Sequence, residues 1–119
     1  TEPCPVNYPL HNTKGAPLVG VEMALQLGLG DPSDLASADR VDAVVGASRS
    51  SVSSPVALLA SLGRVPVISH ASTSPTLQEK GTYGYFSRTI PSDSVTALAA
   101  AQTCFHFKFN NVALMYVDD

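Results

Sequence analysis

The sequence has little charge for its length. Of its 119 residues, 14% are Asp, Glu, Lys or Arg, against roughly 25% in ordinary globular chains. The net charge of −3 leaves no basic surface of the kind that holds phosphates, so no nucleic-acid partner is expected. An apolar fraction of 45% excludes a disordered charged tail. So few charges predict a chain whose surface is partly covered by residues outside it.

Long apolar runs, cysteine clusters and metal-binding motifs are also absent. No apolar run approaches the roughly 18 residues needed to cross a bilayer. Cys4 and Cys104 have none of the spacings of a zinc or redox site, and one disulfide or two free thiols are equally open to them. The sequence has no phosphate-binding glycine loop. We expect no metal, no cofactor and no membrane-spanning segment within these residues.

What the sequence does contain is an alternation of β-branched runs with helical patterns. The predicted strands are 41–46, 65–69, 85–90 and 111–117, and the predicted helices are 17–27, one from 50 or 51 to 62, and one starting at 91–93. Residues 28–40 are predicted to be mostly loop. This order predicts an α/β fold with an open, mostly parallel sheet, right-handed crossovers and helices on both faces.

Two of the helices carry apolar stripes that we expect to face the sheet. In the middle helix, Ser50 or Ser51 is a candidate N-cap and Gly63 a candidate end. Its stripe consists of Val52, Val56, Leu59 and Leu62. The last helix is predicted to turn Val95, Leu98, Ala99, Ala101 and Phe105 inward.

Two loops follow the predicted parallel strands, where ligands bind in open α/β sheets. Residues 46–51 lead into a helix whose first amides and dipole favour an anion, with Ser50 or Ser51 adding a hydroxyl. The loop Ala71, Ser72 and Thr73 offers carbonyls and a hydroxyl, which suit an ammonium group. Together the loops predict a cradle for an α-amino acid. The alternative is that the serines only cap the helix and the second loop is an ordinary turn.

Other chemistry at these loops has less support. Ser48 or Ser50 as the nucleophile of a hydrolase or transferase is an alternative, although the loop lacks the second glycine of a nucleophile elbow. Arg49 is either a contact for an acidic ligand side chain or a solvated charge. His70 is either a site residue or a rim residue, and the histidines have no metal-ligand spacing.

Three motifs at these positions resemble a known family. They are Val-Val-Gly-Ala-Ser-Arg-Ser-Ser-Val at 44–52, Val-Pro-Val-Ile-Ser-His-Ala-Ser-Thr-Ser-Pro-Thr-Leu at 65–77 and Tyr-Phe-Ser-Arg-Thr-Ile-Pro-Ser-Asp at 85–93. They resemble the extracellular ligand-binding region of class C G-protein-coupled receptors, above all metabotropic glutamate receptors. The resemblance is strongest over 42–119 and poor upstream.

The resemblance implies a role for each candidate residue. Ser50 matches the serine that holds the ligand α-carboxylate, and Ser51 supplies an adjoining amide. Ala71 matches a backbone contact to the amino acid and Thr73 the hydroxyl that receives the α-ammonium, with Ser72 as an adjoining position. The stretch 85–93 matches a structural segment and is assigned no ligand contact. No catalytic residue is implied.

The resemblance also implies what the chain is part of. Residues 1–119 correspond to an incomplete lobe one of a Venus-flytrap domain with the type I periplasmic-binding fold. The expected function is a non-enzymatic module that binds an amino acid at the extracellular face of the plasma membrane. The implied partners are this small ligand and a second receptor chain, with the membrane reached only through segments outside these residues. The alternative is a soluble periplasmic amino-acid-binding protein of a transporter.

Overall fold

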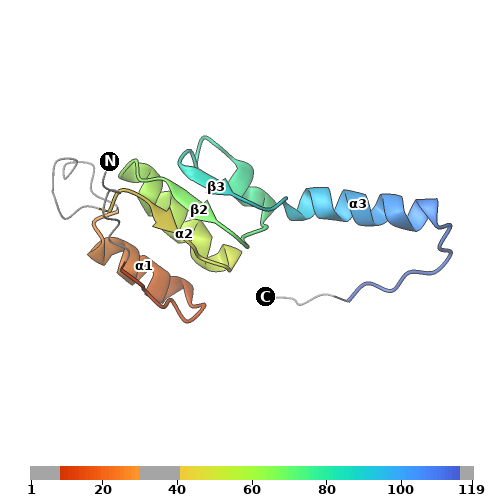
Figure 1. The fold of residues 1–119 in the computed structure, drawn as a ribbon, viewed down its shortest axis with the longest axis horizontal. Coiled ribbons are helices and arrows are strands. Elements are labelled where there is room, and N and C mark those ends of the chain that lie inside the picture. The colour runs from red at the N-terminus through yellow and green to blue at the C-terminus, as the bar shows by residue number, and fades with distance from the viewer. Residues whose placement is uncertain (1–8, 30–40, 116–119) are drawn as a thin grey trace, which may run out of the picture.

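Three short parallel strands form the centre of the structure, a computed structural model that describes residues 9–29 and 41–115. The strands are β1 (Val44–Val45), β2 (Val67–Ser69) and β3 (Phe86–Arg88), in the order β1-β2-β3 (Figure 1). Val67 pairs with Val44 on one side and with Phe86 on the other. The parallel order and the intervening helices confirm the predicted α/β class.

The strands are shorter than predicted. The predicted strand 41–46 contains only Val44–Val45 in the ladder. In the register of β1 and β2, the residue opposite Ala43 is Pro66, which has no N–H to donate. The Pro66 carbonyl still accepts a hydrogen bond from the Val44 amide at 2.9 Å. The ladder therefore starts one residue after the proline.

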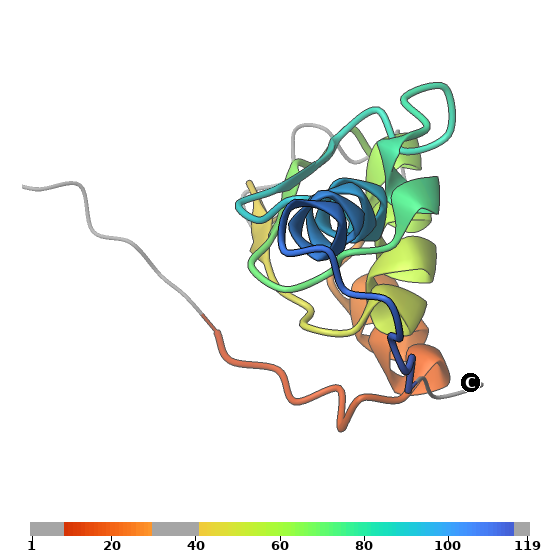
Figure 2. The same cartoon turned by 90° about the vertical axis from the view of Figure 1, so that its right-hand side faces the viewer.

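Two helices lie on one side of the sheet. The helix α1 (Pro17–Gln26) agrees with the predicted helix 17–27, and α2 (Ser50–Leu62) agrees with the helix predicted to follow the first strand. α2 lies against β2, and α1 packs on α2 (Figure 2). At their contact, a Cβ atom on Gly20 would lie 2.7 Å from Cγ1 of Val52. The absence of a side chain at Gly20 thus allows the two helices to approach closely.

The start of α2 differs from the prediction. Its end at Gly63 is as predicted, but the physical reason for a glycine there is different. Arg49, in an extended conformation, is the N-cap residue and makes no capping bond through its side chain. Ser50 and Ser51 are first-turn residues and not caps. Gly63 ends the helix with φ −81°, and the left-handed residue is Arg64. A Cβ at Gly63 would lie 2.1 Å from the Leu29 carbonyl oxygen, so glycine is required there by close packing.

The core lies between α2 and the inner face of the sheet. Val52 and Val56 of the predicted stripe are buried, Leu59 is half-buried and Leu62 is exposed. The buried apolar residues are Ala24, Leu29, Val52, Val56, Ala57, Ala60, Val65, Val67, Leu77 and Phe86. On the opposite face of the sheet Ile68 is 41% and Val45 81% exposed. Within the described residues the helices therefore cover one face only.

The last described segments contradict two predictions. The helix α3 (Asp93–His106) forms as predicted, but it contains no buried residue. Its predicted inward side chains are exposed, because α3 points away from the sheet and none of the described elements packs along it (Figure 1). The predicted strand 111–117 is not a strand over residues 111–115, and its last two residues lie outside the described ranges. The apolar run is present, but none of the three described strands pairs with it.

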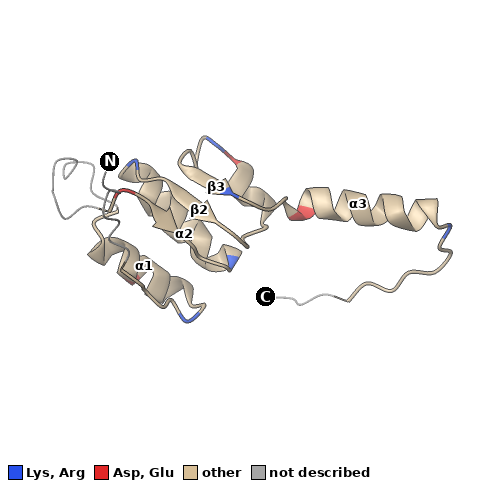
Figure 3. Cartoon of the chain, in the orientation of Figure 1, with Lys and Arg blue, Asp and Glu red and all other residues tan. Residues whose placement is uncertain are grey.

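Two smaller features complete the fold. The one-turn helix η2 (Pro75–Gln78), which the sequence did not predict, follows β2 and buries Leu77. The few charged residues lie mostly in turns and near the ends of elements (Figure 3). Cys104 is half-buried on α3 and forms no disulfide, and Cys4 lies outside the described residues.

Candidate functional site

The two loops singled out from the sequence lie side by side at the carboxyl ends of β1 and β2. Residues 46–49 connect β1 to α2, and residues 70–74 connect β2 to η2. The hydroxyl oxygen of Ser50 accepts a hydrogen bond from the Ser74 amide at 3.1 Å. Ser50, the first residue of α2, therefore joins the end of the first loop to the second loop, although 24 residues separate it from Ser74.

The first turn of α2 presents unused hydrogen-bond donors. The amides of Val52 and Ser53 donate to the Arg49 carbonyl at 3.1 and 2.9 Å. The amides of Ser50 and Ser51 donate to no other residue in the described ranges. Ser50 is half-buried and Ser51 is exposed. Two free amides at the positive end of a helix dipole are donors of the kind that favour an anion, and the Ser50 hydroxyl retains a proton to donate.

The second loop is held by contacts to most of its backbone. The Ser69 hydroxyl accepts hydrogen bonds from the amides of Ala71 at 3.3 Å and Ser72 at 3.0 Å. Nη1 of Arg88 on β3 donates to the carbonyls of Ser72 at 3.2 Å and Ser74 at 2.9 Å. These bonds fix the loop from both sides.

Few polar groups of this loop remain unused. The Thr73 carbonyl accepts a hydrogen bond from the Asp93 amide at the start of α3 at 3.0 Å. Among the described residues, the Ala71 carbonyl and the Thr73 hydroxyl have no partner. Both residues are half-buried. The loop therefore offers two acceptors beside the two free donors of α2.

Ser72 points elsewhere. Its side chain is fully buried, and its hydroxyl lies 2.7 Å from that of Ser53 and 3.0 Å from the Ala47 carbonyl oxygen. The hydroxyl of Ser72 is thus part of the interior of the molecule. A direct contact between this hydroxyl and a ligand has no support in this geometry.

The remaining candidates lie at the rim. The Arg49 side chain lies against the Gly15 backbone, where a Cβ on Gly15 would be 3.0 Å from the guanidinium Nε. His70 and Ser48 are exposed. Across residues 9–29 and 41–115, no His, Asp or Glu side chain hydrogen-bonds Ser48 or Ser50, so neither serine has a base to activate it.

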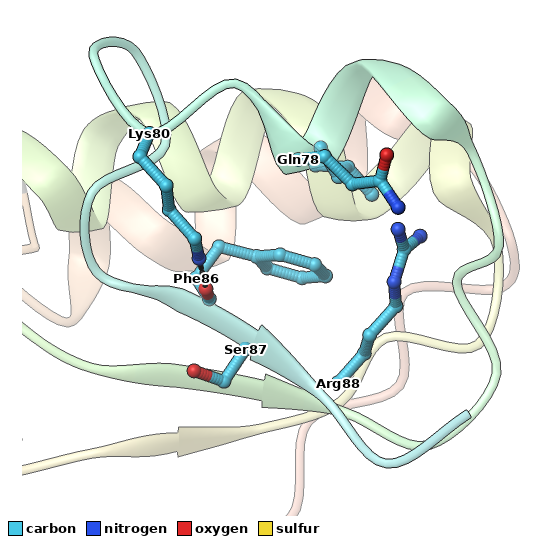
Figure 4. A pocket seen from close by; sticks show the side chains of 6 residues that line it. Gln78, Lys80, Phe86, Ser87 and Arg88 are labelled. Atoms are coloured by element: carbon cyan, nitrogen blue, oxygen red, sulfur yellow. Dashed lines mark hydrogen bonds between the residues drawn. The ribbon is translucent and has the colours of Figure 1, made fainter. Parts of the chain in front are cut away.

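A hollow of about 200 Å³ lies on another part of the surface, beside β3 (Figure 4). Its lining residues are Leu77, Gln78, Lys80, Phe86, Ser87 and Arg88. Nζ of Lys80 donates to the Phe86 carbonyl at 2.5 Å, and Arg88 donates to the loop carbonyls described above. Both cations already donate hydrogen bonds to backbone carbonyls, which hold their side chains against the protein. We place the candidate site at the two loops, where the unused donors and acceptors are.

Metal and membrane features are not found in the described part of the chain. There, no group of three or more His, Cys, Asp or Glu residues is arranged to hold a metal ion. No described helix combines the length and apolar character that a membrane crossing requires.

Sequence reasoning missed three side chains that shape this site. Ser53, Ser69 and Arg88 hold the loops, yet none was predicted to do so. Ser69 gave a weak signal, because it is the polar last residue of a buried β run. The other two gave none, since their hydrogen-bond partners lie 6 to 19 residues away in the chain.

Comparison with known proteins supplies independent information. Residues 4–119 match the family model of the receptor family ligand binding region, a match that begins upstream of the motifs quoted above. Metabotropic glutamate receptor 4 of Rattus norvegicus is 40% identical over 91 residues, which are 76% of this chain and 10% of the receptor.

Two further relatives come from distant animals. The probable metabotropic glutamate receptor mgl-1 of Caenorhabditis elegans is 44% identical over 79 residues, 66% of this chain and 8% of the relative. Metabotropic glutamate receptor 8 of Homo sapiens is 38% identical over 86 residues, 72% of this chain and 10% of the receptor. The matched segments thus span about a tenth of the length of these relatives.

Proposed function

Because the chain belongs to the receptor family ligand binding region, we propose that it forms one wall of an extracellular site for an α-amino acid. Glutamate is the first ligand to test, because the relatives are metabotropic glutamate receptors by name. The residues assigned to ligand binding are Ser50, Ser51, Ala71 and Thr73. Ser72 adjoins them, but its hydroxyl, amide and carbonyl are already hydrogen-bonded within the protein.

The carboxylate half of the proposed site is the start of α2. The free amides of Ser50 and Ser51 point out of the first turn, where the helix dipole favours negative charge. The hydroxyl of Ser50 adds a third donor. Hydrogen bonds from several neutral donors to a carboxylate are charge-assisted and hold it in one orientation.

The ammonium half is the loop after β2. The Ala71 carbonyl and the Thr73 hydroxyl are acceptors without a partner among the described residues. An ammonium group carries three donors and needs such acceptors when it leaves water. Neither half contains a carboxylate side chain that would repel the ligand carboxylate.

One observation carries the proposal: the hydrogen bond from the Ser74 amide to the Ser50 hydroxyl oxygen at 3.1 Å. It joins the donor half to the acceptor half. An α-amino acid requires this closeness, because its amine and its carboxylate are attached to the same carbon atom.

The test is to change each half in the full-length protein and to measure L-glutamate binding by calorimetry. Ser50→Ala removes a donor to the carboxylate, and Thr73→Ala removes an acceptor for the ammonium. Each is expected to cost roughly 1–3 kcal/mol of binding free energy, as for a hydrogen bond to a charged group.

Matched controls are available in the same chain. Ser61→Ala removes a serine hydroxyl of α2 that has no partner in the described ranges, and Thr103→Ala removes a threonine whose hydroxyl bonds only within α3. Both controls should bind L-glutamate as the unchanged protein does. Unaltered binding in Ser50→Ala and Thr73→Ala would contradict the proposed site.

The wider function rests on the same relatives. We propose that the complete protein is a cell-surface receptor that couples ligand binding to G-protein signalling, and that it pairs with a second receptor chain. The relatives are receptors and not enzymes, which supports a non-enzymatic module over a hydrolase. The periplasmic transport alternative is not favoured, because the relatives at 38–44% identity are receptors.

A further inference from the structure

Three buried serine hydroxyls surround one carbonyl oxygen behind the two loops. The side chains of Ser53, Ser69 and Ser72 have no exposed surface. Their hydroxyl oxygens lie 3.1, 2.6 and 3.0 Å from the carbonyl oxygen of Ala47. We call these three residues the serine cluster. Buried polar groups of this number are costly unless each is satisfied, so their convergence on one atom requires an explanation.

The hydrogen bonds of the serine cluster can be assigned from the chemistry of the groups. A carbonyl oxygen has two lone pairs, and each hydroxyl has one proton. Ser69 occupies one lone pair at the shortest distance. Ser53 and Ser72, whose hydroxyls are 2.7 Å apart, share the other, since one donates to the carbonyl and the second donates to its neighbour. The network leaves none of the three hydroxyls unsatisfied.

The serine cluster joins the two halves of the proposed site. Ala47 belongs to the loop that leads into α2, and Ser53 belongs to α2 itself. Ser69 is the last residue of β2 and accepts hydrogen bonds from the amides of Ala71 and Ser72. Movement of one loop relative to the other would break bonds in a buried, low-dielectric setting, where they are strongest.

We propose that the serine cluster is a spacer that fixes the separation of the two halves, and that it thereby selects α-amino acids over β-amino acids. This inference rests on the proposed function. Its members are positioning residues: they act through the Ala47 carbonyl and the loop amides and do not touch the ligand. Ser69 is the main member, because it makes the shortest hydrogen bond to the Ala47 carbonyl and also accepts hydrogen bonds from two amides of the second loop.

The inference can be tested with two isomers of equal charge. L-Glutamate carries its amine and one carboxylate on the same carbon, and 3-aminoglutarate places one more carbon between them. We expect the full-length protein to bind L-glutamate more tightly. Ser69→Ala should lower the ratio of the two affinities by about tenfold, because a loosened spacer accepts both separations. Ser53→Ala should lower it by about two- to fivefold, because Ser69 remains.

Ser61→Ala is the matched control, since Ser61 carries a buried α2 hydroxyl without a partner in the described ranges. It should leave the affinity ratio unchanged. A general loss of stability would weaken the binding of both isomers by the same factor. An equal loss of affinity for the two isomers in Ser69→Ala would therefore overturn the inference. If Ser69→Ala does not fold, Ser53→Ala decides in the same way, and an unchanged ratio there overturns it.

The failure of this inference and that of the proposed function are distinguishable. Absence of L-glutamate binding in the unchanged protein would overturn the proposed function with glutamate as its ligand. The spacer inference, which rests on that function, would fall with it. Tight L-glutamate binding without preference over 3-aminoglutarate would overturn the spacer alone. The proposed contacts of Ser50 and Thr73 would then stand.

Discussion

Two regions of the molecule each contain a helix, and different interactions stabilise the two helices. The packed region, residues 9–29 and 41–92, contains α1, α2, the sheet and every buried residue in the described ranges. The projecting region, residues 93–115, contains none. Yet α2 and α3 are of similar length, at 13 and 14 residues.

The difference lies in what stabilises each helix. α2 begins with four serines and Pro55 among its first six residues, which is a poor helix-forming composition. It is helical because Val52 and Val56 are buried against the neighbouring elements. α3 is rich in alanine, has Asp93 in its first turn and ends where Lys108 adopts a left-handed conformation. Packing thus supports α2, and local sequence supports α3.

The largest expected contrast is between two phenylalanines. Phe86 is 2% exposed on β3, and Phe105 is 87% exposed on α3. Phe86→Ala should lower the free energy of unfolding by about 3–5 kcal/mol through cavity formation. Phe105→Ala should change it by less than about 0.5 kcal/mol. Urea unfolding of this chain measures both.

The same two substitutions can also be compared in a longer form of the protein, where the difference between them can disappear. If Phe105→Ala costs as much as Phe86→Ala there, residues beyond this chain cover α3. Equal effects already in this chain would show that α3 packs on the sheet, contrary to the structure.

The next contrast concerns a glycine and an alanine. Gly20→Ala should raise the helix propensity of α1, but its Cβ would meet Cγ1 of the buried Val52, so a net loss of about 1–3 kcal/mol is expected. Ala100→Gly in α3 meets no neighbour and should cost about 1 kcal/mol from propensity alone. Amide hydrogen exchange of α2 and α3 separates the two effects. A stabilising Gly20→Ala would contradict the close contact of α1 with α2.

The smallest expected effect is the pH response of one exposed turn in the packed region. Hydrogen bonds from the Thr82 side chain and from the amides of Gly81 and Thr82 lower the pKa of Glu79. A lowered pKa means that this contribution to stability is present above the usual glutamate pKa of about 4.3 and is lost as pH falls through the lower folded value. When pH is varied, the NMR signal of the Gly81 amide should shift with a midpoint below pH 4.3. Glu79→Gln should remove this pH-dependent shift.

The predictions made from the sequence were accurate where local pattern decides. The helix 17–27 and the helix after the first strand were found within a residue of their predicted ends, since apolar spacing and turn residues act over short distances. The inward stripe of α3 was wrong, because periodicity shows which face is apolar but not whether a surface lies opposite it. The prediction of a strand at 111–117 was wrong over residues 111–115 for the same reason.

The site shows the same division. Ser50, Ser51, Ala71 and Thr73 could be proposed from strand-end positions, because the carboxyl ends of parallel strands meet at one edge. The buried position of Ser72 could not be predicted from the sequence, because its partners Ala47 and Ser53 lie 25 and 19 residues away. The roles of Ser69 and Arg88 depend on the same long-range contacts.

By itself, the sequence determined the α/β order, the two loops, the low charge and the motifs that place the chain in its family. These depend on residue type and short-range spacing. Only the tertiary structure decided which face of the sheet is covered, where α3 points and how the serine cluster ties the loops together. Those features depend on which distant segments meet, and burial and hydrogen bonding then determine which serines are structural and which remain free for a ligand.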